Sequence, residues 1–415
     1  MKLISAEAAK RLGRIAGTLI ILAAVSGYAA ERASQVGNSN GVPKEKLPPA
    51  TNFVLWPKEN RPAGFRNMDK IFVTAKVAHG PSITPLPVAE TPLVVRYQEG
   101  EREKSVDDFM ADNFTAGLLV LYQDRIVLER YGLGLNKDGA WTSNSVAKSF
   151  TSTLVAAAIK DGAITSVDDL ITKYVPELRH TAWDGVTIRH ALTMSTGVAY
   201  NEQYSAKGDG GRIMGPAVLG GGKPEGTDLI QFLAASPREA APGTKFNYAS
   251  SVARLLGMVV ANATGRKLND YLSEKIWQPA GMEHDASWII DQSGRVMSSC
   301  CLNASLRDFA RFGRFFMSGA MHNGQSVLPA GWVAEATRPA VATGWDDVGY
   351  GYQWWINPDR SYRAIGIFGQ MIYLDPKRDL VIVTLSSWPE AEWDAGYDRQ
   401  DRLVRAIVNA VDSRR

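Results

Sequence analysis

Cysteine is scarce in this sequence of 415 residues, which contains only Cys300 and Cys301. Two adjacent cysteines can close only a small strained ring, so we expect no structural disulfide. A disulfide-rich scaffold is excluded, and the folded body must be held by its hydrophobic core. We interpret both cysteines as small buried apolar residues.

Recognisable metal-binding and nucleotide-binding motifs are also missing. The five histidines show no spacing typical of zinc ligands, so a zinc enzyme is not expected. No G-x-S-x-G motif is present, which argues against an ordinary α/β-hydrolase. The glycine-rich residues 208–226 fit no dinucleotide-binding register, and Lys223 precedes Pro224 instead of the Ser or Thr of a P-loop. This segment is either a mobile lid or a surface insertion.

Charge of one sign is not in excess over most of the chain. The totals are 46 basic and 43 acidic residues, but residues 1–30 contain four basic side chains and one acidic side chain. The rest of the chain therefore holds 42 residues of each sign. A balanced body has no electrostatic reason to bind nucleic acid or anionic lipid.

The beginning of the sequence has the form of an export signal. A basic segment precedes the apolar residues 15–30, which are fewer than the ~20 that a membrane-spanning helix requires. We expect either a cleaved signal peptide or a single uncleaved membrane anchor at residues 1–30. The positive flank would stay inside, so the body would be periplasmic or otherwise exported. Residues 31–52, rich in Pro, Gly, Ser and Asn, are predicted to be a linker.

Patterns typical of β-strands occur near both ends of the body. Two β-rich runs in residues 116–134 predict a hairpin. Most of the chain that follows has helical spacing, and a last amphipathic helix is expected at residues 393–411. Before that helix we expect three strands, at residues 362–367, 370–375 and 380–386.

These elements predict an α/β (α+β) fold. An antiparallel sheet is built from both chain ends and flanked by helices, and a mainly helical domain is inserted in the middle. We place the discontinuous sheet domain at residues 53–163 and 346–415, and the helical domain at residues 164–345.

The clearest chemical signal is Ser145 and Lys148, at the start of a helix expected over residues 142–161. Their i, i+3 spacing places the Ser145 hydroxyl and the Lys148 amine on one helix face. A serine becomes a good nucleophile when a base takes its proton. Lys148 can be that base only when neutral, so burial must lower its pKa below the ordinary value of about 10.4. The alternative is a capping serine and a solvated lysine.

Two further segments could complete such a site. Tyr248 lies just before another apolar helix, and close to Lys148 its hydroxyl could relay a proton. Otherwise it is an aromatic core residue. The glycines of residues 366–370 would allow close backbone approach, and an N–H group facing Ser145 would complete an oxyanion hole. The alternative for this segment is a simple strand bend.

In this order, the motifs resemble the serine β-lactamase and penicillin-binding superfamily. Ser-x-x-Lys is followed by Tyr-x-Ser after a Pro-Gly turn, and then by a glycine-rich strand near the C-terminus. The resemblance covers about residue 53 to the end of the chain. It is strongest to the class C-like branch, which includes 6-aminohexanoate-dimer hydrolases and family VIII-type esterases. Further similar segments are residues 199–204, 302–313, 366–370 and 385–389.

The resemblance implies a β-lactamase/transpeptidase-like fold and a set of catalytic residues. Ser145 would be the nucleophile, Lys148 the base and Tyr248 its partner in proton transfer. The backbone N–H groups of Ser145 and Ile367 would form the oxyanion hole. No metal or cofactor is implied.

The resemblance also implies substrate-binding residues, and the sequence departs from the family at two positions. Tyr200 matches a mobile tyrosine that closes on substrate in the aminohexanoate-dimer branch, and Gly369 is a further candidate. Ser250, also a candidate, stands where class C β-lactamases have asparagine. Phe368 stands where relatives carry Lys-Thr-Gly or a histidine-containing equivalent, so the cation that helps to hold a β-lactam carboxylate is absent.

We therefore predict an exported serine hydrolase that cleaves a small amide or ester through an acyl-enzyme. A linear amide of the 6-aminohexanoate-dimer type is the specific expectation. One alternative is a D,D-peptidase or a β-lactamase-like, penicillin-recognising protein. Another is a non-catalytic envelope binding module. The expected partner is a small molecule and not nucleic acid. The physiological substrate and the oligomeric state stay open.

Overall fold

The computed structural model describes residues 47–204, 208–211, 228–345 and 347–414. The predicted signal or anchor at residues 1–30 lies outside the described residues, as do most of the predicted linker and most of the glycine-rich segment. Among the helices of the described ranges, none combines the length and the apolar character of a membrane span.

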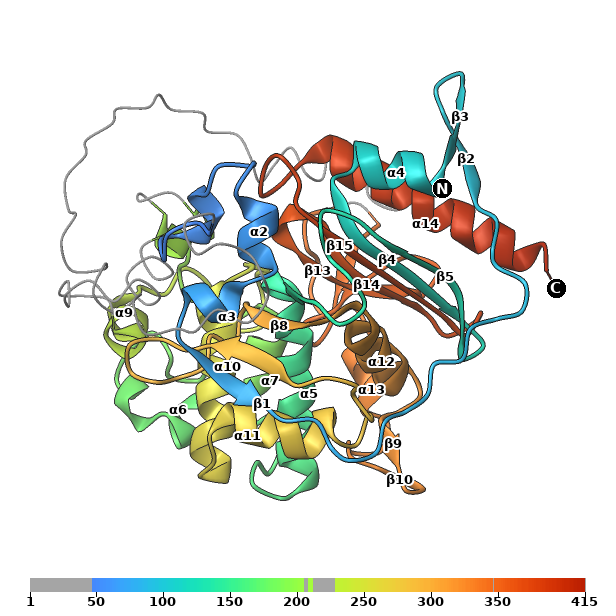
Figure 1. Cartoon of the computed structure of the whole chain (residues 1–415). Helices are drawn as coiled ribbons and strands as arrows, with labels where there is room; N and C mark the ends of the chain where they lie inside the picture. Colours follow the sequence, from blue (N-terminus) through green and yellow to red (C-terminus); the bar gives the residue numbers. More distant parts are fainter. Residues whose placement is uncertain (1–46, 205–207, 212–227, 346, 415) are drawn as a thin grey trace.

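A seven-stranded antiparallel sheet is the centre of the fold (Figure 1). The spatial order of its strands across the sheet is β11-β12-β13-β14-β15-β4-β5, so the early hairpin pairs directly with the C-terminal strands. The predicted fold class is therefore confirmed. The exact boundaries of the two domains stay predictions. The strands are β4 (Thr115–Tyr122), β5 (Arg125–Tyr131), β11 (Gly349–Tyr350), β12 (Trp355–Ile356), β13 (Tyr362–Gly366), β14 (Gln370–Asp375) and β15 (Leu380–Ser386).

Helices cover both faces of this sheet (Figure 1). Along β4, Leu118 and Val120 belong to the apolar cluster beneath α14 (Asp394–Asp412), whereas Leu119 and Leu121 belong to the cluster on the other face. The second face packs against α12 (Leu306–Met317). Side chains of a strand point alternately to opposite faces, and here both sets are buried, which explains the continuously apolar strands.

The early hairpin has the tight turn that its sequence requires. Gln123 and Asp124 join β4 to β5, and their φ angles are +48° and +62°. Positive φ at both central residues of a two-residue turn matches the right-handed twist of paired strands. The predicted hairpin is thus confirmed, with its second strand ending three residues before the predicted segment does, and the three predicted C-terminal strands are confirmed within one residue.

A smaller antiparallel sheet lies among the helices and was not predicted. Its order is β1-β7-β8-β6, and two of its strands fall in the segment expected to be mainly helical. The strands are only three or four residues long, too short to show a clear alternation in the sequence. They are β1 (Thr74–Val77), β6 (Ala140–Thr142), β7 (Ala286–Ile289) and β8 (Leu302–Ser305).

The helical layer that carries the candidate site is built on α5 (Ala147–Lys160) and α10 (Ser250–Thr264), which pack against each other. The α5 helix is buried over nearly its whole length. The other helices are α2 (Arg61–Phe65), α3 (Met68–Ile71), α4 (Val106–Asp112), α6 (Ile171–Tyr174), α7 (Ile188–Leu192), α9 (Leu229–Ala235), α11 (Leu268–Leu272) and α13 (Trp332–Ala336).

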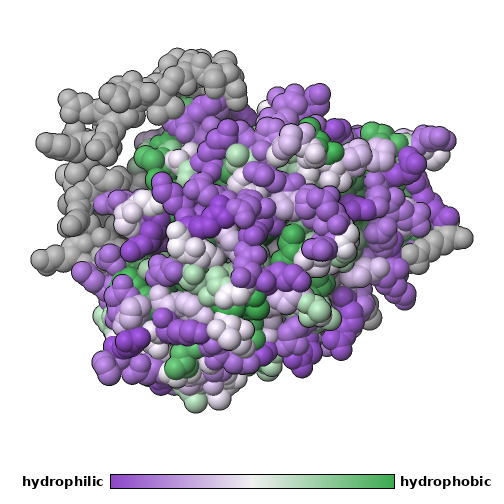
Figure 2. Space-filling view, turned by 90° about the horizontal axis from the view of Figure 1, so that it is seen from below, coloured by the Kyte–Doolittle hydropathy of each residue, from purple (hydrophilic) through white to green (hydrophobic). Residues whose placement is uncertain are grey.

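The face of the molecule in Figure 2 is mostly hydrophilic, with apolar residues in small scattered groups.

Short helical turns and two small hairpins complete the described structure. The turns are η3 (Phe53–Leu55), η4 (Asn144–Val146), η5 (Pro176–Leu178), η6 (Ser273–Trp277) and η7 (Ile367–Gly369), and the hairpin strands are β2 (Arg96–Glu99), β3 (Arg102–Ser105), β9 (Met321–His322) and β10 (Gln325–Ser326).

Candidate active site

Ser145 and Lys148 meet at the start of α5. Ser145 lies in the 3₁₀ turn η4, and Lys148 lies in the first turn of the helix that continues from it. The Lys148 Nζ atom is 2.8 Å from Ser145 Oγ. The i, i+3 spacing therefore brings the two groups together, as the sequence predicts.

The Lys148 amine is enclosed by neutral acceptors. Besides Ser145, it donates to Ser250 Oγ and to the backbone carbonyl of Ser299, each at 3.0 Å. Only 2% of Lys148 is exposed to solvent. Burial lowers the pKa of Lys148 to about 8, while the nearby Glu202 carboxylate acts in the opposite direction. Near neutral pH an appreciable fraction of this lysine is therefore neutral, as a base must be.

Tyr248 lies beside this pair. Its ring centroid is 4.9 Å from Lys148 Nζ, and the ring stacks on Trp355 at 5.7 Å. Burial raises the pKa of the Tyr248 phenol, whereas its hydrogen bond with Ser145 acts to lower it. Because the pKa stays above the ordinary value, the hydroxyl is protonated at neutral pH. Tyr248 is therefore suited to pass a proton on, and not to act as a phenolate base.

The backbone around Ser145 is held in an unusual conformation. Asn144, directly before Ser145, has a φ angle of +43°, and its side chain donates to the Ile367 carbonyl at 2.9 Å. Gly366 lies against the same turn. A Cβ atom there would be 2.7 Å from the Ser143 carbonyl oxygen and 3.0 Å from the Ser145 nitrogen. Glycine is required at position 366 because the end of β13 lies directly against the backbone of Ser145.

Ser250 connects the lysine to an acidic residue. The Ser250 hydroxyl donates to Glu202 Oε1 at 2.5 Å, and the Ser250 backbone nitrogen donates to Glu202 Oε2 at 2.8 Å. The Tyr204 hydroxyl also donates to Glu202 Oε1, at 2.8 Å. Glu202, Tyr204 and the Ser299 carbonyl were not among the predicted site residues. The segment of residues 199–204 was noticed only for its resemblance.

A family model described as Beta-lactamase matches residues 103–406 of this sequence. The chain belongs to this family. The family and its hydrolase relatives make this chain a serine hydrolase of the β-lactamase fold.

The chain is also similar to several known proteins. The 6-aminohexanoate-dimer hydrolase of Paenarthrobacter ureafaciens is 29% identical over 364 residues, which are 84% of this chain and 91% of that protein. A solved structure from Bacillus anthracis, also described as a 6-aminohexanoate-dimer hydrolase, has a TM-score of 0.77 at 23% identity and covers 87% of this chain and 96% of its own. A family VIII carboxylesterase has a TM-score of 0.58 at 17% identity, over 74% of this chain and 96% of its own.

Two predicted binding residues of this β-lactamase-family chain lie apart from the hydrogen bonds of Lys148. Tyr200 packs edge-on against Phe232, and its carbonyl accepts a hydrogen bond from Asn247. Gly369 has a φ angle of +88° and lies under the Trp388 indole, where a Cβ atom would be 2.3 Å from the ring. Their roles in substrate binding stay predictions.

Phe368, the second departure from the family pattern, is a core residue. It is 1% exposed, its ring lies 5.5 Å from that of Phe65, and the Arg61 guanidinium covers it at 4.6 Å. The position is therefore occupied by an apolar side chain that faces the interior of the protein.

The prediction that the two cysteines stay unpaired is wrong. Cys300 and Cys301 form a disulfide, with their Cα atoms 3.7 Å apart. Both are buried, as expected. Cys301 has a φ angle of +69°, and this left-handed residue turns the chain so that two neighbouring side chains face each other. The disulfide directly follows Ser299, whose carbonyl holds the Lys148 amine.

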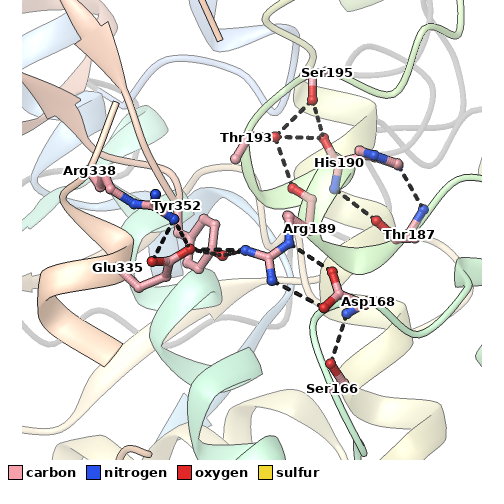
Figure 3. A network of polar contacts seen from close by, with 10 residues as sticks. All are labelled: Ser166, Asp168, Thr187, Arg189, His190, Thr193, Ser195, Glu335, Arg338 and Tyr352. Atoms are coloured by element: carbon pink, nitrogen blue, oxygen red, sulfur yellow. Dashed lines mark hydrogen bonds and ion pairs between the residues drawn. The ribbon is translucent and has the colours of Figure 1, made fainter. Parts of the chain in front are cut away.

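One histidine, His190, helps to cap a helix. His190 Nδ1 accepts a hydrogen bond from the Thr187 backbone nitrogen at the start of α7 (Figure 3). Burial lowers the pKa of His190, which keeps the ring neutral and able to accept. In the described part of the chain, no three His, Cys, Asp or Glu side chains are grouped so that they could hold a metal ion.

Proposed function

We propose that this protein hydrolyses a small amide or ester through an acyl-enzyme on Ser145. The observation that carries the proposal is the 2.8 Å contact between Ser145 Oγ and the buried Lys148 Nζ. A lysine whose pKa is about 8 can accept the serine proton near neutral pH, which a solvated lysine cannot do.

The proposed reaction begins with proton transfer from Ser145 Oγ to neutral Lys148. The oxygen attacks the carbonyl carbon of the substrate, and the backbone N–H groups of Ser145 and Ile367 stabilise the negative oxygen. The close contact of Gly366 with the Ser145 nitrogen supports this placement of the strand. Tyr248 then passes the proton from Lys148 to the leaving amine or alcohol. Water releases the acyl group by the reverse sequence of proton transfers.

We propose a linear amide of the 6-aminohexanoate-dimer type as the substrate. The relative named for this activity, in Paenarthrobacter ureafaciens, shares 29% identity over most of both chains. The buried, apolar Phe368 offers no cation to a β-lactam carboxylate, so we expect poor turnover of penicillins. A panel of a 6-aminohexanoate dimer, p-nitrophenyl esters and labelled penicillin tests this choice. Ester turnover without amide cleavage would favour an esterase, and a stable penicillin adduct would favour a penicillin-recognising protein.

A fluorophosphonate probe tests the nucleophile directly. We expect the probe to label the protein at Ser145, and the Ser145→Ala variant to show no labelling above background. Labelling that persists in this variant would remove Ser145 from the proposal. Thermal unfolding of the variant, followed by circular dichroism, controls for loss of the fold.

We further propose that residues 1–30 direct the protein to the periplasm or another exported location. The support is the basic segment before the apolar residues 15–30. Cell fractionation with N-terminal sequencing of the product distinguishes a cleaved signal from a retained anchor. Full-length protein in the cytoplasmic fraction would contradict export.

A further inference from the structure

Glu202 reaches the catalytic lysine through a single hydroxyl group. Lys148 Nζ donates to Ser250 Oγ at 3.0 Å, and Ser250 Oγ donates to Glu202 Oε1 at 2.5 Å. The second carboxylate oxygen accepts from the Ser250 backbone nitrogen, which fixes the carboxylate at the start of α10. The Tyr204 hydroxyl holds it from the other side. The carboxylate is thus oriented by several donors and points its charge toward the lysine.

The buried amine has no carboxylate in direct contact among the described residues. Its three acceptors are two hydroxyl oxygens and one peptide carbonyl. A buried ammonium group is costly unless an opposite charge compensates it. A carboxylate in direct contact would stabilise the ammonium form and so abolish the base. A carboxylate one hydroxyl away compensates the charge and leaves the lysine able to lose its proton.

We propose that Glu202 is the charge partner of Lys148 and that Ser250 is the bridge that holds the two groups one hydroxyl apart. The Glu202 charge opposes the effect of burial on the pKa of Lys148, and the bridge keeps the carboxylate out of direct contact with the amine. Lys148 therefore loses its proton more readily than a lysine that is paired directly with a carboxylate.

This arrangement suits the base of the proposed reaction. The lone pair of neutral Lys148 then faces Ser145 Oγ, 2.8 Å away. When Lys148 later takes the serine proton, Glu202 stabilises the developing positive charge. The inference rests on the proposed function, and Glu202 is a positioning residue in it because it acts through Ser250 and Lys148.

The other titratable groups near Glu202 differ in their behaviour. Burial raises the pKa of each neighbouring phenol, so these groups stay neutral across the working range. Burial also raises the pKa of Glu392 to about 7, so Glu392 titrates within the same window as the lysine. The groups that interact with Glu202 are Lys148, Tyr200, Tyr204, Tyr248, Tyr350 and Glu392.

The test is the pH dependence of kcat/KM for a p-nitrophenyl ester in the wild type and in Glu202→Gln. The wild type should lose activity below about pH 8, where Lys148 becomes protonated. The negative charge of Glu202 raises the pKa of Lys148, so its removal should move this acid limb to lower pH, by about one unit. The plateau should fall about tenfold or more, because the lysinium formed during attack loses its partner.

Three further variants separate the bridge from a general electrostatic effect. Glu392→Gln removes a neighbouring carboxylate that is not bonded to Ser250, and it should leave the acid limb in place. Ser250→Thr keeps the hydroxyl and should retain the limb with most of the activity, whereas Ser250→Ala should lower the plateau. An equal shift of the limb in Glu392→Gln and Glu202→Gln would overturn the role of the bridge.

An acid limb that stays in place in folded Glu202→Gln, whatever its plateau, would mean that Glu202 has only a structural role. If this variant does not fold, Glu202→Asp provides the same test, because its carboxylate lies one methylene farther from Ser250. We then expect a smaller limb shift in the same direction, and an unmoved limb overturns the proposal.

NMR of the Lys148 Cε resonance in 13C-lysine-labelled protein reads the same pKa without catalysis. It can be applied in the Ser145→Ala background. A shift of this pKa in Glu202→Gln would support the inference even if the fluorophosphonate test had rejected Ser145 as the nucleophile. The two failures are therefore distinguishable.

Discussion

Arg189 and Lys148 are two cations of this protein that lie in contrasting polar networks. Arg189 contacts the Asp168 carboxylate at 2.7 Å, the Glu335 carboxylate at 2.9 Å and the Tyr352 hydroxyl (Figure 3). These contacts, the Asp168 hydrogen bond first, raise the pKa of Arg189. Within the described part of the chain, the hydrogen bonds of Lys148 go to neutral oxygens. This lysine is almost fully buried, and its pKa falls to about 8.

The contrast shows how the environment of a cationic side chain decides whether it serves the fold or can exchange a proton. Arg189 stays charged at any working pH. Its carboxylate contacts tie α7 to α13 and to the loop around Tyr352, which is a structural function. Neutral acceptors and burial leave Lys148 close to losing its proton, which suits a base. Burial is the largest cause of the low pKa of Lys148, and the described residues place no carboxylate in direct contact with its amine to offset it.

The largest effect that the comparison predicts is loss of activity in Lys148→Met. We expect kcat/KM for an ester or amide substrate to fall about a thousandfold or more, because the serine loses its base. The matched variant Arg189→Met should keep kcat within about twofold, because no described contact joins Arg189 to Ser145. Steady-state kinetics on both folded variants checks this. Comparable losses of activity in the two variants would contradict the proposal that Lys148 acts in the reaction and Arg189 only in the fold.

The pairing of Lys148 with Ser145 was predictable from the sequence because the two residues lie close together along the chain. Ser145 and Lys148 share one turn, so spacing alone brings them together. The hairpin of residues 116–134 and the C-terminal strands were predictable for a similar reason: each pairs with the next strand along the chain.

Other parts of the site depend on contacts that leave no local signal. The Ser299 carbonyl lies 151 residues from Lys148, and every residue has such a carbonyl. Glu202 meets Ser250 across 48 residues, so only the folded chain reveals that it acts on the lysine. The disulfide depends on the left-handed backbone conformation of Cys301, and two adjacent cysteines in a sequence do not by themselves indicate this conformation.

A glycine substitution tests the turn that holds Ser145. In Gly366→Ala the new methyl group would meet the Ser143 carbonyl at 2.7 Å and the Ser145 nitrogen at 3.0 Å. Backbone atoms cannot move aside as a flexible side chain can, so the strand must shift away from Ser145. We expect kcat to fall about tenfold or more through loss of oxyanion geometry, as measured by steady-state kinetics.

Gly162, just beyond the other end of α5, is the control for this prediction. Its φ angle is +79°, and nothing lies within 4 Å of a Cβ atom built there. Gly162→Ala should therefore cost about 1 kcal/mol of folding stability through backbone strain, with kcat unchanged. A loss of kcat in this variant equal to that in Gly366→Ala would assign the effect to α5 as a whole and not to the contact with Ser145.

The smallest expected effect concerns the stability that Arg189 provides. Arg189→Met should lower the free energy of unfolding at pH 7 by about 1 kcal/mol, since the Arg189 and Glu335 side chains are more than one-third exposed and Asp168 is mostly exposed, so solvent screens the pairs. Urea denaturation of the wild type and the variant measures the difference. Moderate salt should reduce it further.

The pH dependence of that difference tests its electrostatic origin. Hydrogen bonds with Arg189 and with Arg338 lower the pKa of Asp168 and of Glu335, respectively. A carboxyl group whose pKa is lower in the folded state stabilises the fold above its unfolded pKa of about 4, and this contribution is lost as the pH falls through the folded value. The difference between wild type and Arg189→Met should therefore shrink between pH 6 and pH 3. A difference that stays constant over this range would mean that Arg189 stabilises the fold by packing its apolar stem, and the contrast with Lys148 would then rest on burial instead of charge pairing.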